Sequence, residues 1–141
     1  MSDRDIHILE ELFAAFSDGD IERILPLTHP QFVATIPPEL SPEPDTYRGH
    51  EGVRRYFSSF ADAMEQVRFE PQRFWDAGEG VVVAMRMTAR GNQTAIPVEQ
   101  RFAQIWTIRD GLVASVRTFS SLPDALEAAG LSAAAAAARG A

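Results

Sequence analysis

Hydrophobic residues follow a mostly helical period in the first half of the chain and alternate with polar residues in the second half. Over Asp3–Ser17 the apolar positions recur three or four residues apart, with acidic residues on the other faces, which predicts an amphipathic helix. Asp20 is a suitable N-cap for a shorter helix over Ile21–Leu27. Alternation over Gln31–Ile36 predicts a short strand, and a helical period over His50–Val67 predicts a second long helix.

Four strands are predicted in the second half, each separated from the next by a turn signal. The first two cover Arg68–Trp75 and Gly80–Arg90, and the last two lie within Pro97–Ser121. Asp110-Gly111 divides that last stretch, and Asp-Gly between β-branched and aromatic residues favours a tight hairpin. Short turns between successive strands indicate an antiparallel meander. Helices grouped ahead of the strands indicate an α+β domain with helices on one face of the sheet.

The remaining segments set the limits of this domain. Pro37–Asp45 is rich in proline and acidic residues, so we expect a surface loop placed to cover the mouth of a cavity. Leu122–Ala129 is expected to form a short helix closed by Gly130. The end of the chain is alanine-rich and offers no large side chain to bury. We therefore expect a single domain over 1–131 and a poorly ordered tail over 132–141.

Composition and charge exclude several classes of protein. The chain has 141 residues, of which 45% are hydrophobic, and this suits one globular domain. Its net charge of -7 and its pI near 4.9 argue against binding of a nucleic acid, and its lack of lysine excludes Schiff-base chemistry by a lysine. It contains no cysteine, which excludes disulfides and a thiolate nucleophile. The amino terminus lacks the apolar core of a signal peptide and no apolar run is long enough for a membrane span, so we expect a cytoplasmic protein.

The predicted strand over Val98–Ile108 has two faces of different character. One face carries Gln100 and Gln104 among large apolar side chains, whereas the other begins with the charged residue Glu99. Buried amides need hydrogen-bond partners, so the first face suits the wall of a ligand cavity better than a dry core. Gln104 is the best marker of such a cavity, because its amide can polarise a carbonyl or hold a ligand hydroxyl. The ordinary alternative is a hydrogen bond to a neighbouring core side chain.

Two tyrosines and a histidine are candidates for acid–base chemistry. Tyr56, on the helix that faces the sheet, and Tyr47, in the adjoining loop, are suited to donate a proton to a ligand oxygen. His29 lies between the second helix and the first strand and is a candidate general base. The alternatives are core tyrosines and a structural histidine. The three histidines show no metal-ligand spacing, so we expect no metal or other cofactor.

Arg86 alternates with Met85 and Met87 along its predicted strand. Either the arginine or the two methionines therefore face the cavity. We place the methionines inside, because methionine adapts well to varied apolar ligands. An inward Arg86 would instead indicate an anionic ligand.

The order of these elements resembles the SnoaL-like branch of the nuclear transport factor two-like, or ketosteroid isomerase-like, superfamily. The motifs that carry the resemblance are Gly19-Asp20, Tyr47-Arg48-Gly49-His50-Glu51-Gly52-Val53-Arg54, Arg109-Asp110-Gly111 and Leu126-Glu127-Ala128-Ala129-Gly130-Leu131. The resemblance implies a cone-shaped, strongly curved antiparallel sheet that wraps around the N-terminal helices and encloses a cavity. It also implies a homodimer formed through the outer face of the sheet, where we place Ile105, Val113 and Phe119.

Members of this family include ketosteroid isomerase, polyketide cyclases, limonene epoxide hydrolase, scytalone dehydratase and non-catalytic proteins. The ketosteroid isomerase pattern fails here. Leu12 aligns with the catalytic tyrosine, Ile36 with the general base and Gln104 with the oxyanion-hole aspartate. The water-activating Asp-Arg-Asp set of the epoxide hydrolases is not matched either, since no predicted long strand carries an aspartate within it.

Two functions of different class stay open. The first is proton-transfer catalysis, such as isomerisation, cyclisation or dehydration of a small apolar carbonyl compound, with Gln104 as polariser and Tyr56 or His29 as acid or base. The second is a non-catalytic dimer that binds or carries a small hydrophobic molecule. In both, we expect the ligand to contact Phe13, Phe16, Tyr47, Phe60, Met85, Met87, Gln100, Phe102, Trp106 and Val116.

Overall fold

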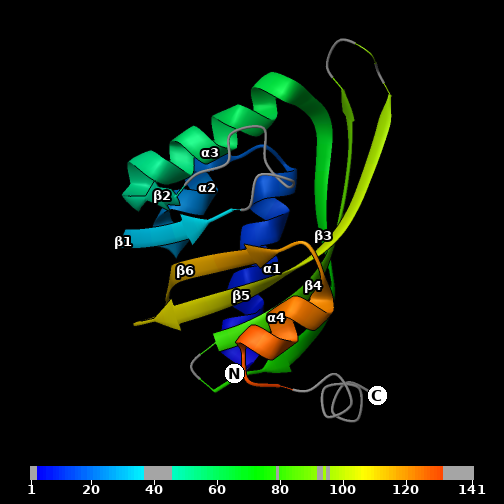
Figure 1. The fold of residues 1–141 in the computed structure, drawn as a ribbon. Coiled ribbons are helices and arrows are strands. Elements are labelled where there is room, and N and C mark those ends of the chain that lie inside the picture. Colours follow the sequence, from blue (N-terminus) through cyan, green and yellow to red (C-terminus); the bar gives the residue numbers. More distant parts are fainter. Residues whose placement is uncertain (1–2, 37–45, 79, 92–93, 95, 132–141) are drawn as a thin grey trace.

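The computed structural model describes residues 3–36, 46–78, 80–91, 94 and 96–131, except for the side chains of residues 60, 61 and 63. These ranges contain the helices α1 (Asp3–Ser17), α2 (Ile21–Ile24), η1 (Leu25–Leu27, a 3₁₀ helix), α3 (Gly49–Ala63) and α4 (Leu122–Ala128) (Figure 1). The strands are β1 (Thr28–Thr35), β2 (Thr46–Arg48), β3 (Met64–Asp76), β4 (Gly80–Gly91), β5 (Pro97–Arg109) and β6 (Leu112–Phe119). None of the described helices has the length and apolar character needed to cross a membrane.

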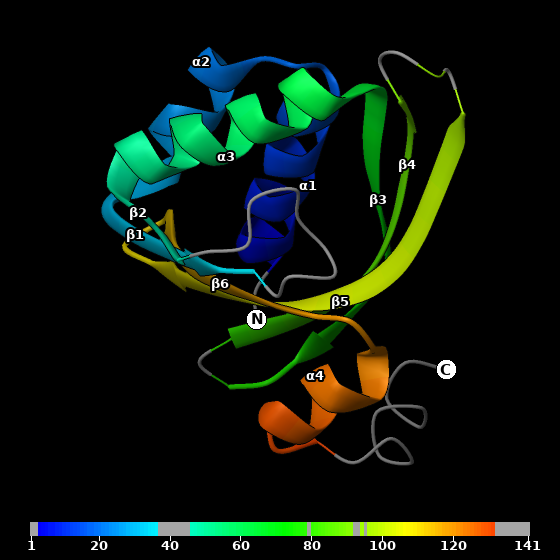
Figure 2. The same cartoon turned by 45° about the horizontal axis from the view of Figure 1, so that its top comes forward.

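The strands form one curved sheet in the order β2-β1-β6-β5-β4-β3. β3 to β6 make the predicted antiparallel meander, and β1 also pairs antiparallel with β2. β1 and β6 are parallel, with Ala34 opposite Val116, so the sheet is mixed rather than wholly antiparallel. This pair joins strands from distant parts of the chain, and no local turn signal reveals such a pairing. The sheet curves strongly without closing into a barrel (Figure 2).

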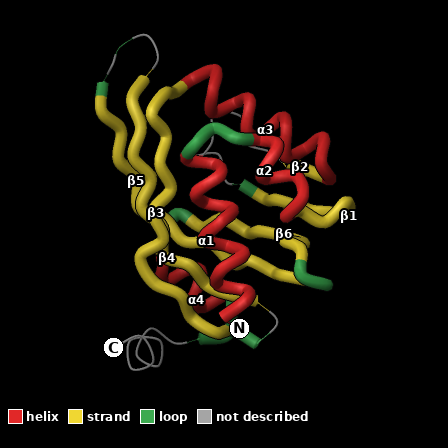
Figure 3. The backbone as a smooth tube through the Cα atoms, turned by 180° about the vertical axis from the view of Figure 1, so that it is seen from behind, coloured by secondary structure: helices red, strands yellow, loops and turns green. Residues whose placement is uncertain are grey.

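Helices lie on both faces of the sheet. On the concave face, α1 and α3 lie within the curve (Figures 2 and 3), and Leu9 of α1 is buried in one core with Val83 of β4. On the outer face, Leu126 of α4 packs in a smaller core with Trp75 of β3. The predicted α+β domain wrapped around its N-terminal helices is therefore confirmed. Helix α4 is the short helix predicted over Leu122–Ala129, but its place on the outer face is not predicted, since the sequence indicates helices on one face only.

Most element boundaries follow the sequence pattern. α1 has the predicted ends, and it is followed by Gly19 with a φ of +72°, a left-handed conformation common after helices. α3 ends four residues before the predicted end at Val67, because Met64–Val67 extends β3 and Val67 packs against the core. β1 begins at Thr28, three residues earlier than predicted, and β2 is not predicted. The predicted loop 37–45 and tail 132–141 lie outside the described residues.

The hairpin between β5 and β6 turns at Asp110 and Gly111, as predicted. Their φ angles of 56° and 76° are left-handed at both positions, which suits Asp-Gly. A register shift between Thr107 and Ile108 places an extra residue in β6. That irregularity turns Val113 inward, where it is 1% exposed. The placement of Val113 on the outer face is therefore wrong, because a bulge reverses the alternation on which it rested.

Candidate ligand cavity

A cavity lies between the concave face of the sheet and helices α1 and α3. Its volume is about 70 Å³, counted as the space that the centre of a water molecule can reach. One water molecule needs about 10–15 Å³ on that measure, so the space suits several waters or one small organic molecule. The lining side chains are Leu12, Phe13, Phe16, Ile24, Thr28, Phe32, Ala34, Ile36, Tyr47, Val53, Tyr56, Phe69, Gln104, Trp106, Val113 and Val116.

Aromatic side chains from α1 form one wall of the cavity. Phe13 and Phe16 are one helical turn apart and so share the face that meets the sheet. The Phe13 ring meets Trp106 edge-on with 5.5 Å between centroids, and the Phe16 ring meets Phe69 in the same way at 4.7 Å. Edge-to-face geometry is favoured by the ring quadrupoles. These ring contacts therefore fix the apolar side chains that line the cavity around α1.

Gln104 brings an amide into this apolar surface. Its side chain is 6% exposed, and it lies opposite Thr118 in the pairing of β5 with β6. The indole Nε1–H of Trp106 donates to Gln104 Oε1 at 3.0 Å, and Gln104 Nε2 donates to Thr118 Oγ1 at 3.2 Å. Both interpretations of the sequence hold in part, because Gln104 lines a cavity and its amide is also bonded to neighbouring side chains.

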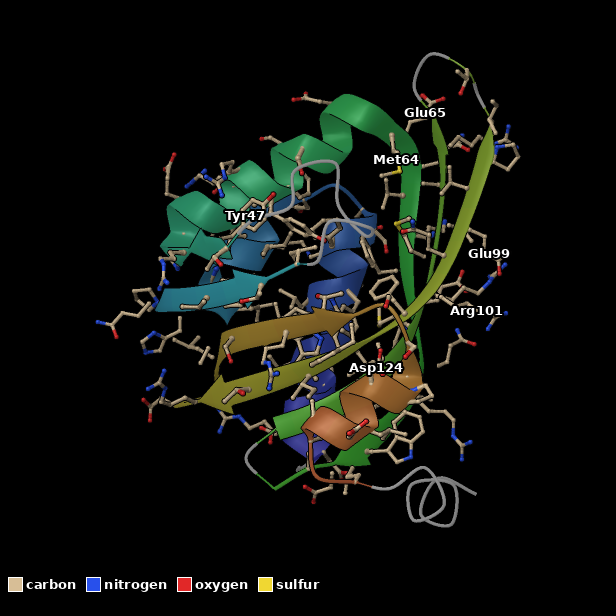
Figure 4. All side chains as sticks on the ribbon, viewed as in Figure 1. Tyr47, Met64, Glu65, Glu99, Arg101 and Asp124 are labelled. Atoms are coloured by element: carbon tan, nitrogen blue, oxygen red, sulfur yellow. The ribbon has the colours of Figure 1, made fainter. Side chains whose placement is uncertain are left out.

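Tyr47 of β2 and Tyr56 of α3 lie side by side. Their ring centroids are 5.0 Å apart, and the Arg55 guanidinium stands 4.5 Å from the centre of the Tyr47 ring. Figure 4 shows Tyr47 next to α3. Burial raises the pKa of the Tyr56 phenol well above its ordinary value, and the nearby Tyr47 adds to the rise. Tyr56 is therefore a neutral phenol near neutral pH, able to donate a hydrogen bond but unsuited to accept a proton.

Several predicted ligand contacts lie away from the described cavity. Met85, Met87 and Phe102 are buried in the core on the concave side, but they do not line the cavity among the described residues. Gln100 is half-buried farther along β5, opposite Met87. The Phe60 side chain lies outside the described residues. Contact of these five side chains with a ligand stays a prediction.

The structure separates His29 from Gln104 and Tyr56. His29 Nδ1 accepts a hydrogen bond from the backbone N–H of Gln31 at 3.0 Å, whereas its neighbour Thr28 lines the cavity. Neighbours on a strand point to opposite faces. The position of His29 therefore favours its structural interpretation over a role as general base.

Arg86 lies on the outer face of the sheet. Its guanidinium contacts Glu70 Oε2 and Glu99 Oε1, each at 3.1 Å. Figure 4 shows Glu99 and Arg101 on the side of β5 turned away from α1 and α3. Of the two arrangements that the alternation allows, the structure therefore has the one in which the methionines face the concave side of the sheet. An outward Arg86 gives no indication of an anionic ligand.

Some residues that line the cavity are not predicted from the sequence. Phe32, Ala34 and Ile36 alternate along β1 and just beyond it, so the pattern could have identified them once β1 was known to line the cavity. Thr28 precedes the predicted strand, and its Oγ1 donates to the Ile24 carbonyl at 2.9 Å. No sequence signal marks Thr28 as part of a cavity.

The described walls of the cavity are uncharged. Its polar side chains are the hydroxyls of Thr28, Tyr47 and Tyr56, the amide of Gln104 and the indole of Trp106. Within the ranges that the structure describes, no three His, Asp or Glu residues are grouped so that they could hold a metal ion. Walls of this kind suit a small apolar molecule that carries one or two polar atoms.

Comparisons with known proteins agree with this architecture. Residues 9–116 match the model of the SnoaL-like domain. TerC co-crystallised with polyporic acid is 23% identical, with coverage of 90% of this chain and 98% of that chain and a TM-score of 0.74. An NTF2-like protein from Burkholderia xenovorans LB400 is 27% identical, with coverage of 84% and 90% and a TM-score of 0.71. SalBIII, an epoxide hydrolase/cyclase-like enzyme with a role in pyran ring formation in the polyether salinomycin, is 23% identical. The match covers 86% of this chain and 92% of that chain, with a TM-score of 0.69. No curated protein gives a significant match.

Proposed function

Because the chain belongs to the SnoaL-like domain family, we propose that its interior cavity binds a small, uncharged and mainly apolar molecule. The observation that carries the proposal is the cavity itself, in which Gln104 and Tyr56 stand among aromatic and aliphatic walls. A concave apolar space with a few fixed polar groups is the usual form of a small-molecule site. TerC, which has the same fold, was crystallised with polyporic acid.

The protonation states of the polar groups favour binding over catalysis. General acid–base catalysis is most effective when the pKa of the catalytic group lies near the working pH. Burial holds the pKa of Tyr56 far above that range, and the Gln104 amide does not titrate. The described walls can therefore orient and polarise a ligand oxygen. They offer no side chain that would take up a proton near neutral pH.

Tryptophan fluorescence tests this proposal. The chain has two tryptophans, of which Trp106 lines the cavity and Trp75 lies in the outer core. In a Trp75→Phe variant all tryptophan emission comes from Trp106, so titration with small bicyclic hydrocarbons and ketones reports on the cavity. We expect a saturable change with one site per chain, and little change in a Trp106→Phe control. Emission of Trp106 that responds saturably to none of these compounds would contradict the proposal.

Proton-transfer catalysis is a second candidate. It is favoured by one observation, namely that Tyr56 and Gln104 line the same cavity and are both able to donate to a developing oxyanion. Exchange of α-hydrogens of small cyclic ketones in heavy water, followed by NMR, tests it. With a base from the solvent or buffer removing the α-hydrogen and the two donors stabilising the enolate oxygen, exchange would be accelerated, and Tyr56→Phe would reduce the rate by about 100-fold, as expected for loss of an oxyanion donor. Exchange at the rate of the buffer alone would contradict catalysis and leave binding intact.

The outer face of the sheet supports a proposal on assembly. Ile105 and Phe119 lie there half-buried beside α4, and the Arg117 guanidinium stands 5.2 Å from the centre of the Phe119 ring. Apolar groups rimmed by charge are typical of protein interfaces. We propose that two copies of the chain associate through this face.

A further inference from the structure

Three side chains on the inner face of β5 and β6 form a directional chain of hydrogen bonds. The indole N–H of Trp106 is a donor only, so the Gln104 atom that it meets at 3.0 Å is the oxygen. The amide nitrogen then lies toward Thr118, with 3.2 Å between Nε2 and Oγ1. An isolated glutamine amide could turn over and exchange its two ends. Here the chemistry of Trp106 decides its orientation.

This orientation determines what the amide offers to a molecule in the cavity. The oxygen accepts from the indole and one N–H is directed at Thr118; the described part of the chain offers no other partner to the amide, so its second N–H can serve a ligand. A hydrogen bond accepted by the oxygen polarises the amide and strengthens its N–H groups as donors. The oxygen keeps a second lone pair, but the bond that it already accepts from the indole makes it a weaker acceptor for a ligand donor. The amide therefore favours a ligand that brings an acceptor.

We propose that Trp106 is a positioning residue for Gln104, and that it makes the cavity prefer hydrogen-bond acceptors such as ketones over donors of similar shape. This inference rests on the proposed function, since it needs a ligand in the cavity. Trp106 would thus contribute an aromatic wall through its ring and ligand preference through its N–H.

Three bicyclic probes of similar size separate the inference from the proposed function. Indene has no hydrogen-bonding group, indanone has only an acceptor, and indole has an N–H donor. We expect indanone to bind the wild-type protein about five- to tenfold more tightly than indene, which is the range that one net hydrogen bond gives. Indole should bind no more tightly than indene. If indene does not bind at all, the proposed function fails. If indene binds and indanone shows no advantage, only the inference fails.

Substitution of Trp106 supplies the decisive comparison. Trp106→Phe keeps an aromatic ring and removes the N–H, so the amide becomes free to turn its oxygen toward the ligand. We expect the advantage of indanone over indene to fall to about twofold or less, with indole gaining affinity. Trp75→Phe is the matched control, because it makes the same change in the outer core and should keep the wild-type ratio. An unchanged ratio in Trp106→Phe would overturn the inference.

A ligand-free measurement keeps the inference testable if that variant does not fold. Protein labelled with the heavy nitrogen isotope should show two indole N–H signals, one from each tryptophan. Trp75→Phe assigns them by removing one signal. In Gln104→Leu we expect the Trp106 signal to move and its proton to exchange faster with solvent, while the Trp75 signal stays in place. A Trp106 signal that does not respond would show that the bond to Gln104 is absent, and the inference would fall.

Discussion

Gln104 and Trp106 form a buried donor–acceptor pair, so their substitutions should not be additive. Gln104→Leu leaves the indole N–H without its acceptor, and we expect the free energy of unfolding to fall by about 1–3 kcal/mol. Combining Gln104→Leu with Trp106→Phe removes both partners, so the double variant should lose clearly less than the sum of the two single losses. Urea unfolding of the four proteins measures this coupling. Additive losses would mean that the hydrogen bond contributes nothing to the fold.

Glu99 gives the outer face a pH-dependent contribution to stability. The hydrogen-bonded Arg86 guanidinium holds the pKa of the Glu99 carboxyl below its ordinary value. A lowered folded-state pKa stabilises the protein above the ordinary pKa, and that stabilisation is lost as the pH falls through the folded-state value. Glu99→Gln should therefore unfold more easily than wild type near neutral pH, and the two should converge in acid, once the pH has fallen below the folded-state pKa of Glu99.

The matched control for this effect is Glu10→Gln, which changes an exposed carboxylate of α1 that makes no ion pair among the described residues. Unfolding curves of the three proteins at both pH values check the prediction. Because Glu99 is exposed and Arg86 is only half-buried, the difference should be small and should shrink further in high salt. A difference between Glu99→Gln and wild type that persisted unchanged in acid would contradict the assignment.

Helix α3 is fixed against β2 by a close approach at Gly52. A Cβ atom added there would lie 2.8 Å from the backbone carbonyl carbon of Tyr47. Helix propensity alone would make Gly52→Ala stabilising by about 1 kcal/mol, but the clash is with backbone and cannot be relieved by a side-chain rotation. We expect the clash to dominate, with a net loss of about 1–3 kcal/mol. Ser58→Ala, at an exposed position of the same helix, is the control and should be neutral or slightly stabilising. Thermal unfolding distinguishes the signs of the two effects.

The elements that the sequence predicts well are those whose signal is local. α1 and the Asp110-Gly111 hairpin depend on helical periodicity and on turn chemistry, and both are confirmed. The end of α3 is missed because Met64–Val67 continues the apolar pattern of the helix while pairing as a strand. Val113 is predicted on the wrong face of the sheet, because a bulge interrupts the alternation from which the facing of each side chain is inferred. The inward Gln104 follows from alternation alone, whereas its bond to Thr118 depends on the register of β6.

We predict that two copies of the chain form a dimer in solution. Sedimentation at micromolar concentration should give a species of twice 15.5 kDa. Ile105→Arg, which places a charge among the apolar groups of the outer face, should shift the protein toward monomer and leave ligand binding in the cavity unchanged. A single 15.5 kDa species for the wild type would contradict the proposed interface.

The cavity is a property of the whole molecule, and this limits what the sequence reveals of it. Its walls include Phe32 of β1 and Val116 of β6, which meet only through the parallel pairing of their strands. Its size depends on the curvature of the sheet around α1. Neither the parallel pairing nor the curvature leaves a local pattern in the chain, although the family resemblance implies both a cavity and a curved sheet.

A crystal structure of the protein saturated with indanone would show directly whether the cavity binds a small apolar ketone. We expect electron density for the probe inside the cavity, in contact with Phe13 and Trp106, with its carbonyl oxygen within hydrogen-bond distance of Gln104 Nε2. A cavity that holds only water or is filled by its own side chains, with the probe absent or confined to the outer surface, would contradict the proposed function.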